Sequence, residues 1–498
     1  MHPASSQALL ALLTATCAVL PASRALAQDP GYERSYVIRA DAAWRTPTDR
    51  ISPAFVGVDQ GRIEWISKTN RAEGGRGGLI PTKPPKVIEV KGTLAAGIVD
   101  AWCRLGPGDL LAEDRDLLAK GRDQPLRRVT DALPLQRQGE DSLFVAQVLA
   151  ARNSGIAALY ISSGTGRLRS GVGTAAGFSG FDLPVAKGIQ ALDCAVGIAL
   201  GAQSTYAAQD LVDAFGEAKD WRESLDEHRE KMEQYDKDME EYRKKFDEYA
   251  KKKAESEGKE TKEAKEKEPA KNGDKKEGGD KQAGEKKEEE KKEGEKKEGE
   301  KKDEEKKDEA PKRPERPKEP KPDAARDLIL DAFDGELAVR VAADDAEDIR
   351  LLLAAQEEHG LDLVILGGYW ADQVAGALAD ADVPVILAAL PDHHARRYPD
   401  RSLAARYRAL RAAGVTVALA SGGGESEQSL LLARAGELVA AGEDPAEIWA
   451  ALTAVPARIL GLGGEYGTLA AGCSASMVLF EGTSPFDAST PFKAHKPR

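Results

Sequence analysis

The chain has 498 residues, of which 41% are hydrophobic and 31% charged, and its formal net charge at pH 7 is −13. This length allows two or three domains with at least one large core. An acidic chain with a pI near 5.3 lacks the basic surface typical of nucleic-acid-binding proteins, so we expect no nucleic-acid partner.

The first 27 residues resemble an export signal. A short apolar stretch, ALLALLTATCAVLPA, is followed by Ala25-Leu26-Ala27, which has the small-x-small form read by signal peptidase. The stretch is shorter than the roughly 20 residues needed to cross a bilayer. We therefore expect residues 1–27 to be a signal peptide, the mature protein to be periplasmic or extracellular, and no transmembrane span after signal removal.

Both ends of the remaining chain predict short strands joined by turns. The runs YVIRADAAWR, AFVGVDQGRIEWIS and VIEV lie before Lys91, and SASMVLFEG lies near the C-terminus. Strands from both ends can pair in one small sheet structure. We expect residues 28–92 and 462–498 to form a composite β-sandwich.

Between these ends, β-prone runs recur at 157–162, 336–343, 361–368, 383–390 and 415–421. Helical stretches rich in Ala, Leu and Arg separate the last four runs, which is typical of parallel βα units. Their number fits a (β/α)8 TIM-like barrel, here assigned to residues 93–218 and 324–461. The Gly-rich stretch 162–177 lacks the spacings of phosphate-binding loops and is interpreted as a turn.

A charged insertion interrupts the barrel. Residues 254–323 contain no Val, Ile, Leu, Met, Phe, Tyr, Trp or Cys, so we expect a disordered Lys/Glu-rich linker. Just before it, apolar residues alternate at spacings of four and three, which predicts one helix over 219–253. These residues are Trp221, Leu225, His228, Met232, Tyr235, Met239, Tyr242, Phe246 and Tyr249. The helix packs on its own domain or pairs as a coiled coil, so oligomerisation through it remains open.

Three stretches resemble the amidohydrolase superfamily, in its imidazolonepropionase-like or dihydroorotase-like branch. They are LAAGIVDAWCRLG at 94–106, AVRVAADDAEDIRLLLAAQEEHGLDLVILGG at 338–368 and ALTAVPARILGLGGEYGTLAAG at 451–472. The resemblance implies a barrel beside a composite sandwich. It also implies a metal centre, held mainly by His side chains, that lowers the pKa of a bound water to make the nucleophile.

Other residues occupy the positions where the family carries its metal ligands. These positions are Trp102, Arg104, Ala342, Asp344, Gly367 and Gly422. Asp100, just before the first His position, is kept, whereas Cys473, Ser474 and Ser476 replace the usual Lys and Asp residues of the last motif. Without these ligands we expect no metal cofactor and a catalytically degenerate protein that acts as a binding or scaffold module.

The carboxyl ends of barrel strands are the usual location of a binding site. The candidate pocket residues are Asp100, Trp102, Arg104, Asp344, Tyr369, Trp370, His393, His394 and Glu425. The partner is an unknown small molecule or protein. The alternative is a metal-dependent hydrolase acting on C–N bonds of a cyclic amide or peptide, with His393, His394 and an acidic side chain holding one ion. A structural role for the barrel, as the carrier of a tether, is a third reading, and Cys103 is either a packed thiol or a thiolate activated by Arg104.

Overall fold

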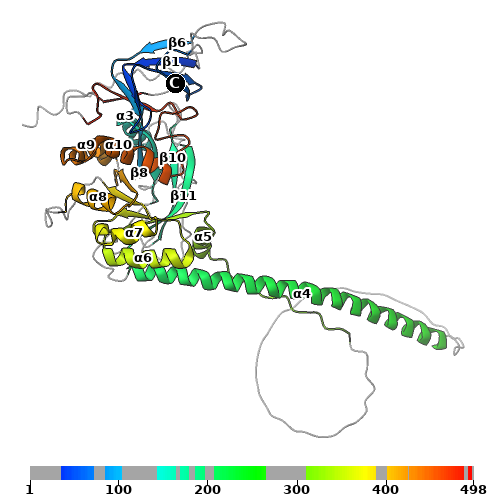
Figure 1. The fold of residues 1–498 in the computed structure, drawn as a ribbon. Coiled ribbons are helices and arrows are strands. Elements are labelled where there is room, and N and C mark those ends of the chain that lie inside the picture. Colours follow the sequence, from blue (N-terminus) through cyan, green and yellow to red (C-terminus); the bar gives the residue numbers. More distant parts are fainter. Residues whose placement is uncertain are drawn as a thin grey trace, which may run out of the picture. The chain divides into compact units, whose positions relative to one another are not determined.

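The computed structural model describes residues 35–71, 85–103, 143–163, 169–178, 185–196, 207–264, 310–388, 401–423, 425–486 and 492–495. The chain divides into two compact units, residues 1–219 with 323–498, and residues 220–322. The first unit contains the barrel and the sandwich, and the second contains most of one long helix, α4 (Figure 1). The predicted signal peptide lies outside the described residues. Within the described ranges, no helix is long and apolar enough to cross a membrane.

The centre of the first unit is an eight-stranded sheet in the order β15-β14-β13-β12-β11-β10-β9-β8. Its strands are β8 (Ile98–Cys103), β9 (Ile156–Ile161), β10 (Arg169–Gly177), β11 (Val185–Ala195), β12 (Ala338–Ala343), β13 (Leu363–Gly367), β14 (Val385–Ala388) and β15 (Val417–Ala420). Residues just after β15 return to β8, where the Gly422 amide donates to the Trp102 carbonyl at 2.9 Å. The sheet thereby approaches a closed ring, which confirms the predicted TIM-like barrel.

Strand β10 departs from the parallel pattern, because it pairs antiparallel with both β9 and β11. Its residues belong to the Gly-rich stretch interpreted as a turn, and that interpretation is wrong for 169–177. The glycines serve close packing instead. A Cβ atom added to Gly173 would lie 2.3 Å from the Tyr160 hydroxyl, so only glycine lets β10 approach this side chain.

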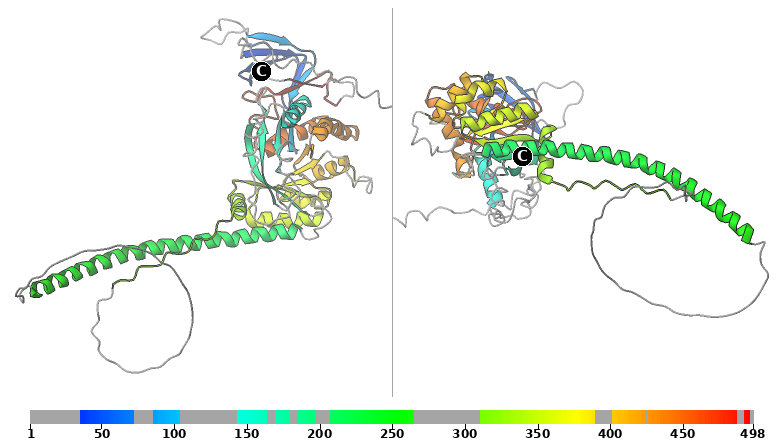
Figure 2. Two further views of the ribbon diagram at one scale, coloured as in Figure 1. Left: turned by 180° about the vertical axis from the view of Figure 1, so that it is seen from behind. Right: turned by 90° about the horizontal axis from the view of Figure 1, so that it is seen from below.

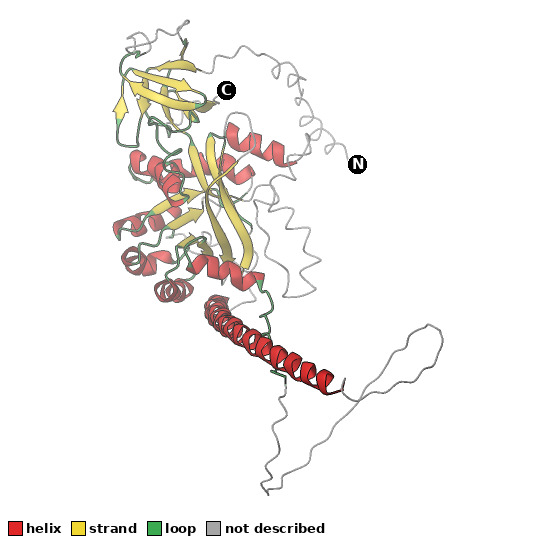
Figure 3. Cartoon of the chain, turned by 90° about the vertical axis from the view of Figure 1, so that its right-hand side faces the viewer, coloured by secondary structure: helices red, strands yellow, loops and turns green. Residues whose placement is uncertain are grey.

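Helices cover the outer face of the barrel (Figure 3). They are α3 (Leu143–Asn153), α5 (Ala324–Phe333), α6 (Ala346–His359), η3 (Ala371–Val374), α7 (Ala375–Asp380), α8 (Leu403–Ala412), α9 (Glu425–Ala440) and α10 (Pro445–Leu452). Helix α11 (Ala454–Ile459) packs instead against the inward residues of the strands, through Ala457. Local sequence sets their ends, as in α6. The Asp345 side chain caps its first turn by accepting from the Glu347 amide at 2.9 Å, and Gly360 ends it at a φ of 67°.

The two faces of the barrel strands carry different side chains, because successive residues of a strand point to opposite sides. Outward residues such as Val339, Val341 and Leu363 pack against the helices. The inward cluster is rich in alanine and contains Ala158, Ala175, Ala191, Ala195, Ala338, Ala342, Ala418 and Ala420. These small side chains leave room for a few large ones in the barrel interior.

The sandwich consists of two sheets with the strand orders β5-β4-β1-β6 and β17-β16-β7-β2-β3. Its strands are β1 (Ser35–Ala40), β2 (Ala42–Trp44), β3 (Arg50–Ile51), β4 (Ala54–Asp59), β5 (Arg62–Ser67), β6 (Lys86–Glu89), β7 (Thr93–Ala96), β16 (Met477–Phe480) and β17 (Phe492–His495). Strand β16, from the C-terminal part, pairs antiparallel with β7, from the N-terminal part. The predicted composite sandwich from both chain ends is therefore present.

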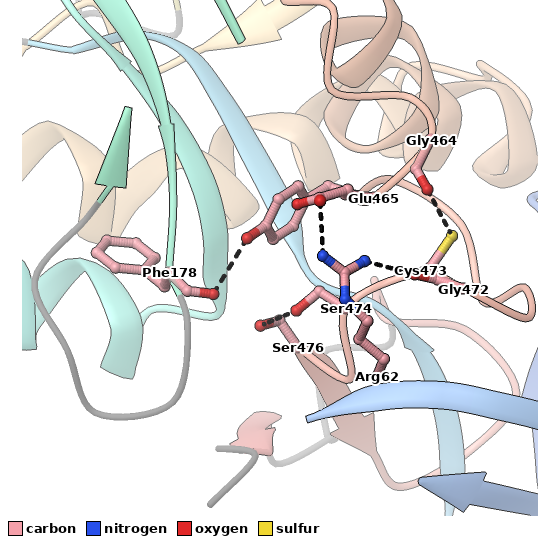
Figure 4. A network of polar contacts seen from close by, with 9 residues as sticks. Arg62, Phe178, Gly464, Glu465, Gly472, Cys473, Ser474 and Ser476 are labelled. Carbon is pink, nitrogen blue, oxygen red and sulfur yellow. Dashed lines mark hydrogen bonds and ion pairs between the residues drawn. The ribbon is translucent and has the colours of Figure 1, made fainter. Parts of the chain in front are cut away.

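A polar network connects the last family-like motif to both the sandwich and the barrel (Figure 4). Arg62, at the start of β5, donates to the Gly472 carbonyl at 2.8 Å and to Glu465 at 2.7 Å. The neighbouring Tyr466 hydroxyl donates to the Phe178 carbonyl, just after β10, at 3.2 Å. Cys473 contacts the Gly464 carbonyl through its sulfur at 3.7 Å. This motif, despite its altered residues, holds the chain ends against the barrel.

Helix α4 (Ala207–Ala264) is longer than the predicted range 219–253, and Figure 2 shows it as one continuous helix. In the first unit, Leu211, Phe215 and Ala218 are buried, and the Phe215 ring lies 6.1 Å from that of His359. In the second unit, no side chain between 220 and 255 is buried. The helix also includes 254–264, where the linker was expected to begin, because Lys and Glu are good helix formers.

Candidate functional site

The predicted pocket residues fall into two described clusters and one group that cannot be placed. Asp100 and Trp102 lie on β8, and Asp344, Tyr369 and Trp370 follow β12 and β13. Arg104, His393 and His394 lie outside the described residues, as does the side chain of Glu425, the first residue of α9. Convergence of the whole set on one pocket therefore stays a prediction.

Asp100 is fully buried and joins β8 to the residues after β15. One carboxylate oxygen accepts from the Ser421 amide at 2.9 Å, and the other accepts from the Ser421 hydroxyl at 2.6 Å and from the Gln428 side chain at 3.0 Å. Burial raises the pKa of Asp100, and the hydrogen bonds from Ser421 oppose this rise. Asp100 thus closes the barrel with donors supplied by the protein itself.

Trp102 occupies the position of the family's first His ligand. Its side chain is 5% exposed and belongs to the interior cluster of the barrel. The indole Nε1 has no hydrogen-bond partner among the described residues. A donor-only apolar ring therefore stands where the family places a metal-binding imidazole.

Asp344, Tyr369 and Trp370 lie together at the ends of β12 and β13. Asp344 accepts from the Tyr369 amide at 3.2 Å, which fixes the turn after β13. The Arg401 guanidinium lies 3.8 Å from the Trp370 ring centroid, and Arg406 of α8 lies 4.7 Å from that of Tyr369. Cation–π contacts with the α8 region thus position both aromatic side chains.

A second charged cluster, absent from the sequence-based candidates, occupies the barrel interior. Asp193 of β11 and Arg340 of β12 are directly opposite in the strand register, and both are fully buried. The Arg340 guanidinium lies 3.8 Å from the Tyr160 ring centroid and donates to the Ala101 carbonyl. The Tyr160 hydroxyl in turn donates to Asp193 at 3.0 Å. Tyr160 therefore contacts both charged groups.

Three further donors satisfy the Asp193 carboxylate. They are the Ser162 hydroxyl at 3.1 Å, the Ser163 amide at 2.6 Å and the Ser163 hydroxyl at 2.9 Å. Burial raises the pKa of Asp193 to about 6, and the charge of Arg340 opposes this rise. Burial also lowers the pKa of Arg340, which remains the guanidinium at neutral pH. The barrel interior thereby contains a fixed cation of its own.

The described residues do not fit the metal centre that the resemblance implies. The last inward positions of β11 to β15 are Ala195, Ala342, Leu366, Ala388 and Ala420, whose side chains offer no ligand atom, and the carboxylate of Asp193, one inward position earlier in β11, already accepts the hydrogen bonds described above. At Gly367 and Gly422 the backbone has φ values of 84° and 68°, so these two ligand positions form left-handed turns. Across the described ranges, no group of three or more His, Cys, Asp and Glu side chains could hold a metal ion.

Cys103 is a packed thiol in this structure. Its side chain is fully buried, and its sulfur donates to the Tyr160 carbonyl at 3.2 Å. Arg104 lies outside the described residues, so the alternative, a thiolate activated by this guanidinium, stays untested.

The sequence carried one usable signal for the interior cluster. Arg340 is the single charged residue in the run AVRVAA, which is otherwise apolar. A charge at an inward position of a barrel strand needs a buried partner. The partner Asp193 gave no comparable signal, because strand β11 was not predicted.

Comparisons with known proteins agree with this architecture. No protein-family model matches the sequence, and no curated protein does. Among solved structures, the chain is similar to an amidohydrolase from Thermotoga maritima MSB8, with a TM-score of 0.61 and 16% sequence identity over 93% of this chain and 98% of that chain. Its similarity to a zinc-bound adenosine deaminase from Xanthomonas campestris has a TM-score of 0.41 and 12% identity over 90% and 84% of the two chains, too low to support an argument. From the first similarity, the chain has the amidohydrolase fold.

Proposed function

We propose that this chain is a catalytically degenerate amidohydrolase-fold protein, exported after removal of residues 1–27, that acts as a binding or scaffold module. One observation carries the proposal. Two buried carboxylates, Asp193 in the barrel interior and Asp100 between β8 and α9, already accept hydrogen bonds from the protein's own side chains and amides. A metal ion would have to displace these donors.

The charge of Arg340 adds a second reason. A divalent ion needs anionic or neutral ligands with free lone pairs, and Arg has no acceptor atom at all. An ion bound to Asp193 would lie close to the guanidinium and be repelled by it in a low-dielectric interior. Arg340 therefore favours a metal-free barrel.

A barrel without a metal centre can still bind a ligand at its rim, the edge formed by the carboxyl ends of the strands. Trp102, Tyr369 and Trp370 bring aromatic rings to strand ends, and Asp344 and Arg401 place charges near them. Convergent aromatic and polar groups are typical of ligand sites. The ligand is a small molecule or a protein segment, recognised through these groups.

Elemental analysis tests the proposal. The full-length mature chain is incubated with excess zinc, manganese or nickel, dialysed, and its metal content measured beside its hydrolysis of cyclic amides and dipeptides. We expect far less than one ion per chain and no activity. One ion per chain, with chelator-sensitive hydrolysis of a C–N bond, would overturn the proposal in favour of a divergent hydrolase.

Two variants locate any ion that is found. Asp100→Asn and Asp193→Asn each remove one of these two buried carboxylates. An ion lost from Asp193→Asn would show that the interior binds metal despite Arg340, and an ion lost from Asp100→Asn would place the ion between β8 and α9. An ion kept by both would point to loop residues such as His393 and His394.

A further inference from the structure

We propose that residues 311–320 form a polyproline II strap that covers the apolar seam of α4, so that helix and strap make one arm within a single chain. The strap is the segment PKRPERPKEP, from the predicted linker. The seam is the set of α4 residues at heptad positions a and d between 225 and 249. Its members are Leu225, His228, Met232, Tyr235, Met239, Tyr242, Phe246 and Tyr249.

The exposure of the strap residues repeats every three positions. The residues at 311, 314, 317 and 320, all prolines, are half-buried, whereas the residues between them are exposed, as is Pro322. The segment lies outside any helix or strand. Polyproline II has three residues per turn, so these four prolines lie on one face of it. We infer that another surface covers this face along its whole length.

Helix α4 is the element that lies beside this face. Both segments belong to the second unit, and Figures 1 and 2 show the chain running back along α4 before it enters α5. The prolines recur every ~9 Å along polyproline II, and heptads recur every ~10.5 Å along a helix, so each proline can meet a successive heptad. Proline-rich segments dock in grooves lined by aromatic rings, and four of the eight seam residues are Tyr or Phe.

The length of the strap matches the part of the seam that is shielded. Arg326 of α5 contacts Glu217 of α4 at 3.2 Å, so the chain enters α5 beside an early turn of α4. Residues 311–323 extend for about 37 Å in polyproline II, which is the length of about 25 helical residues. The strap therefore ends near Tyr242, which is half-buried. Phe246 lies beyond this end and is 44% exposed.

Charge favours the chain's own strap over a second copy of the helix. Residues 311–321 contain five basic and two acidic side chains, which gives a net charge of +3. Residues 225–249 contain six basic and ten acidic side chains, which gives −4. The strap is therefore attracted to the helix, whereas two copies of the helix segment would repel each other.

Hydrogen exchange of the full-length mature chain tests the contact. The variant Pro314→Ser/Pro317→Ser should speed amide exchange at residues 228–242 about tenfold, because the helix loses half of the prolines that cover it. The control is Pro322→Ser, the same change at an exposed proline outside the stripe, which should leave this exchange unaltered. Urea unfolding of the barrel should be the same in all these chains. Equal exchange in the variant and the control would overturn the proposal.

The variant Tyr235→Ala/Tyr242→Ala tests the contact from the side of the helix. Ala is the better helix former, so a helix without a strap would exchange its amides more slowly after this change. A strapped helix should exchange them faster, because two rings of its docking groove are lost. Slower exchange would therefore refute the strap.

Light scattering after size exclusion decides between the strap and a second copy. We expect the Tyr235→Ala/Tyr242→Ala variant and the unmodified chain to have the same mass at every concentration, since the seam is covered within one chain. A dimer of the unmodified chain that becomes monomeric in this variant would show that a second copy covers the seam, and would overturn the proposal.

Discussion

Substitution of Arg340 by Met tests whether the barrel interior is stabilised by its own charge pair. The change keeps an unbranched apolar stem while removing the guanidinium near Asp193. Neighbouring strands lie about 5 Å apart, so two opposite charges on facing residues attract by roughly 3 kcal/mol at an effective dielectric constant of about 20. Loss of this attraction should raise the pKa of Asp193 further.

The pH dependence separates this attraction from simple loss of packing. The pKa of Asp193 is about 6 in the folded chain, against 3.8 for an ordinary Asp. A raised pKa means that the stabilising effect is complete below 3.8 and is lost as the pH rises through 6. In the Arg340→Met chain this loss should continue above pH 6. Each pH unit of pKa shift corresponds to about 1.4 kcal/mol. The destabilisation of the variant relative to the unmodified chain should therefore be ~2 kcal/mol larger at pH 7.5 than at pH 5.

The assay is urea unfolding followed by tryptophan fluorescence at pH 5 and pH 7.5. The Asp193→Asn variant and the double variant complete a mutant cycle, in which the coupling between the two positions should appear at pH 7.5 and shrink at pH 5. An equal loss of stability for Arg340→Met at both pH values would refute the reasoning. Asp193 would then be uncharged throughout, and Arg340 would act through packing on Tyr160 alone.

Four further substitutions probe packing and closure. Gly173→Ala should destabilise the fold by about 1–3 kcal/mol, because the added Cβ would lie within 3 Å of Tyr160 and Asp193. Gly216→Ala is the control, since Gly216 lies in a helix with open space around it, and this change should raise the melting temperature slightly. Ser421→Ala removes the hydroxyl that contacts Asp100 and the Trp102 carbonyl, so it should lower the free energy of unfolding in urea by about 1–3 kcal/mol. A decrease below about 0.5 kcal/mol would contradict a role of Ser421 in closing the barrel. Arg62→Ala should lower the free energy of unfolding by no more than ~1 kcal/mol in the same assay, because the Arg62 side chain is 50% exposed. A larger decrease would show that the polar contacts drawn in Figure 4 stabilise the fold cooperatively.

The barrel could be predicted because its later strands are apolar, short and separated by helices. Each predicted run from 336 onward contains an observed strand, with ends differing by a few residues. Strands β10 and β11 were missed for a physical reason. They are rich in Gly, Ala and polar residues, and Gly173 of β10 packs against Tyr160 and Asp193, so their fit depends on tertiary neighbours rather than on β propensity.

Only part of the candidate site could be predicted from the sequence. Positions near strand ends follow from the strand pattern, so Trp102 near the end of β8 and Tyr369 just after β13 lie where they were predicted, whereas their role in a site stays a prediction. The direction and the partners of a side chain do not follow from that pattern. Contact between Tyr369 and Arg406 depends on how α8 packs, and the pairing of Asp193 with Arg340 depends on which strands are neighbours.

The hydrogen bonds of Asp100 give this residue a structural role in the closure of the barrel. A buried carboxylate costs free energy unless hydrogen bonds or a cation offset the loss of water. Asp100 receives donors from Ser421 and Gln428, and Asp193 receives donors from two serines and a tyrosine with Arg340 nearby. The same contacts stabilise the fold without any bound ion, so a metal ion at either carboxylate would have to displace donors that contribute to that stability.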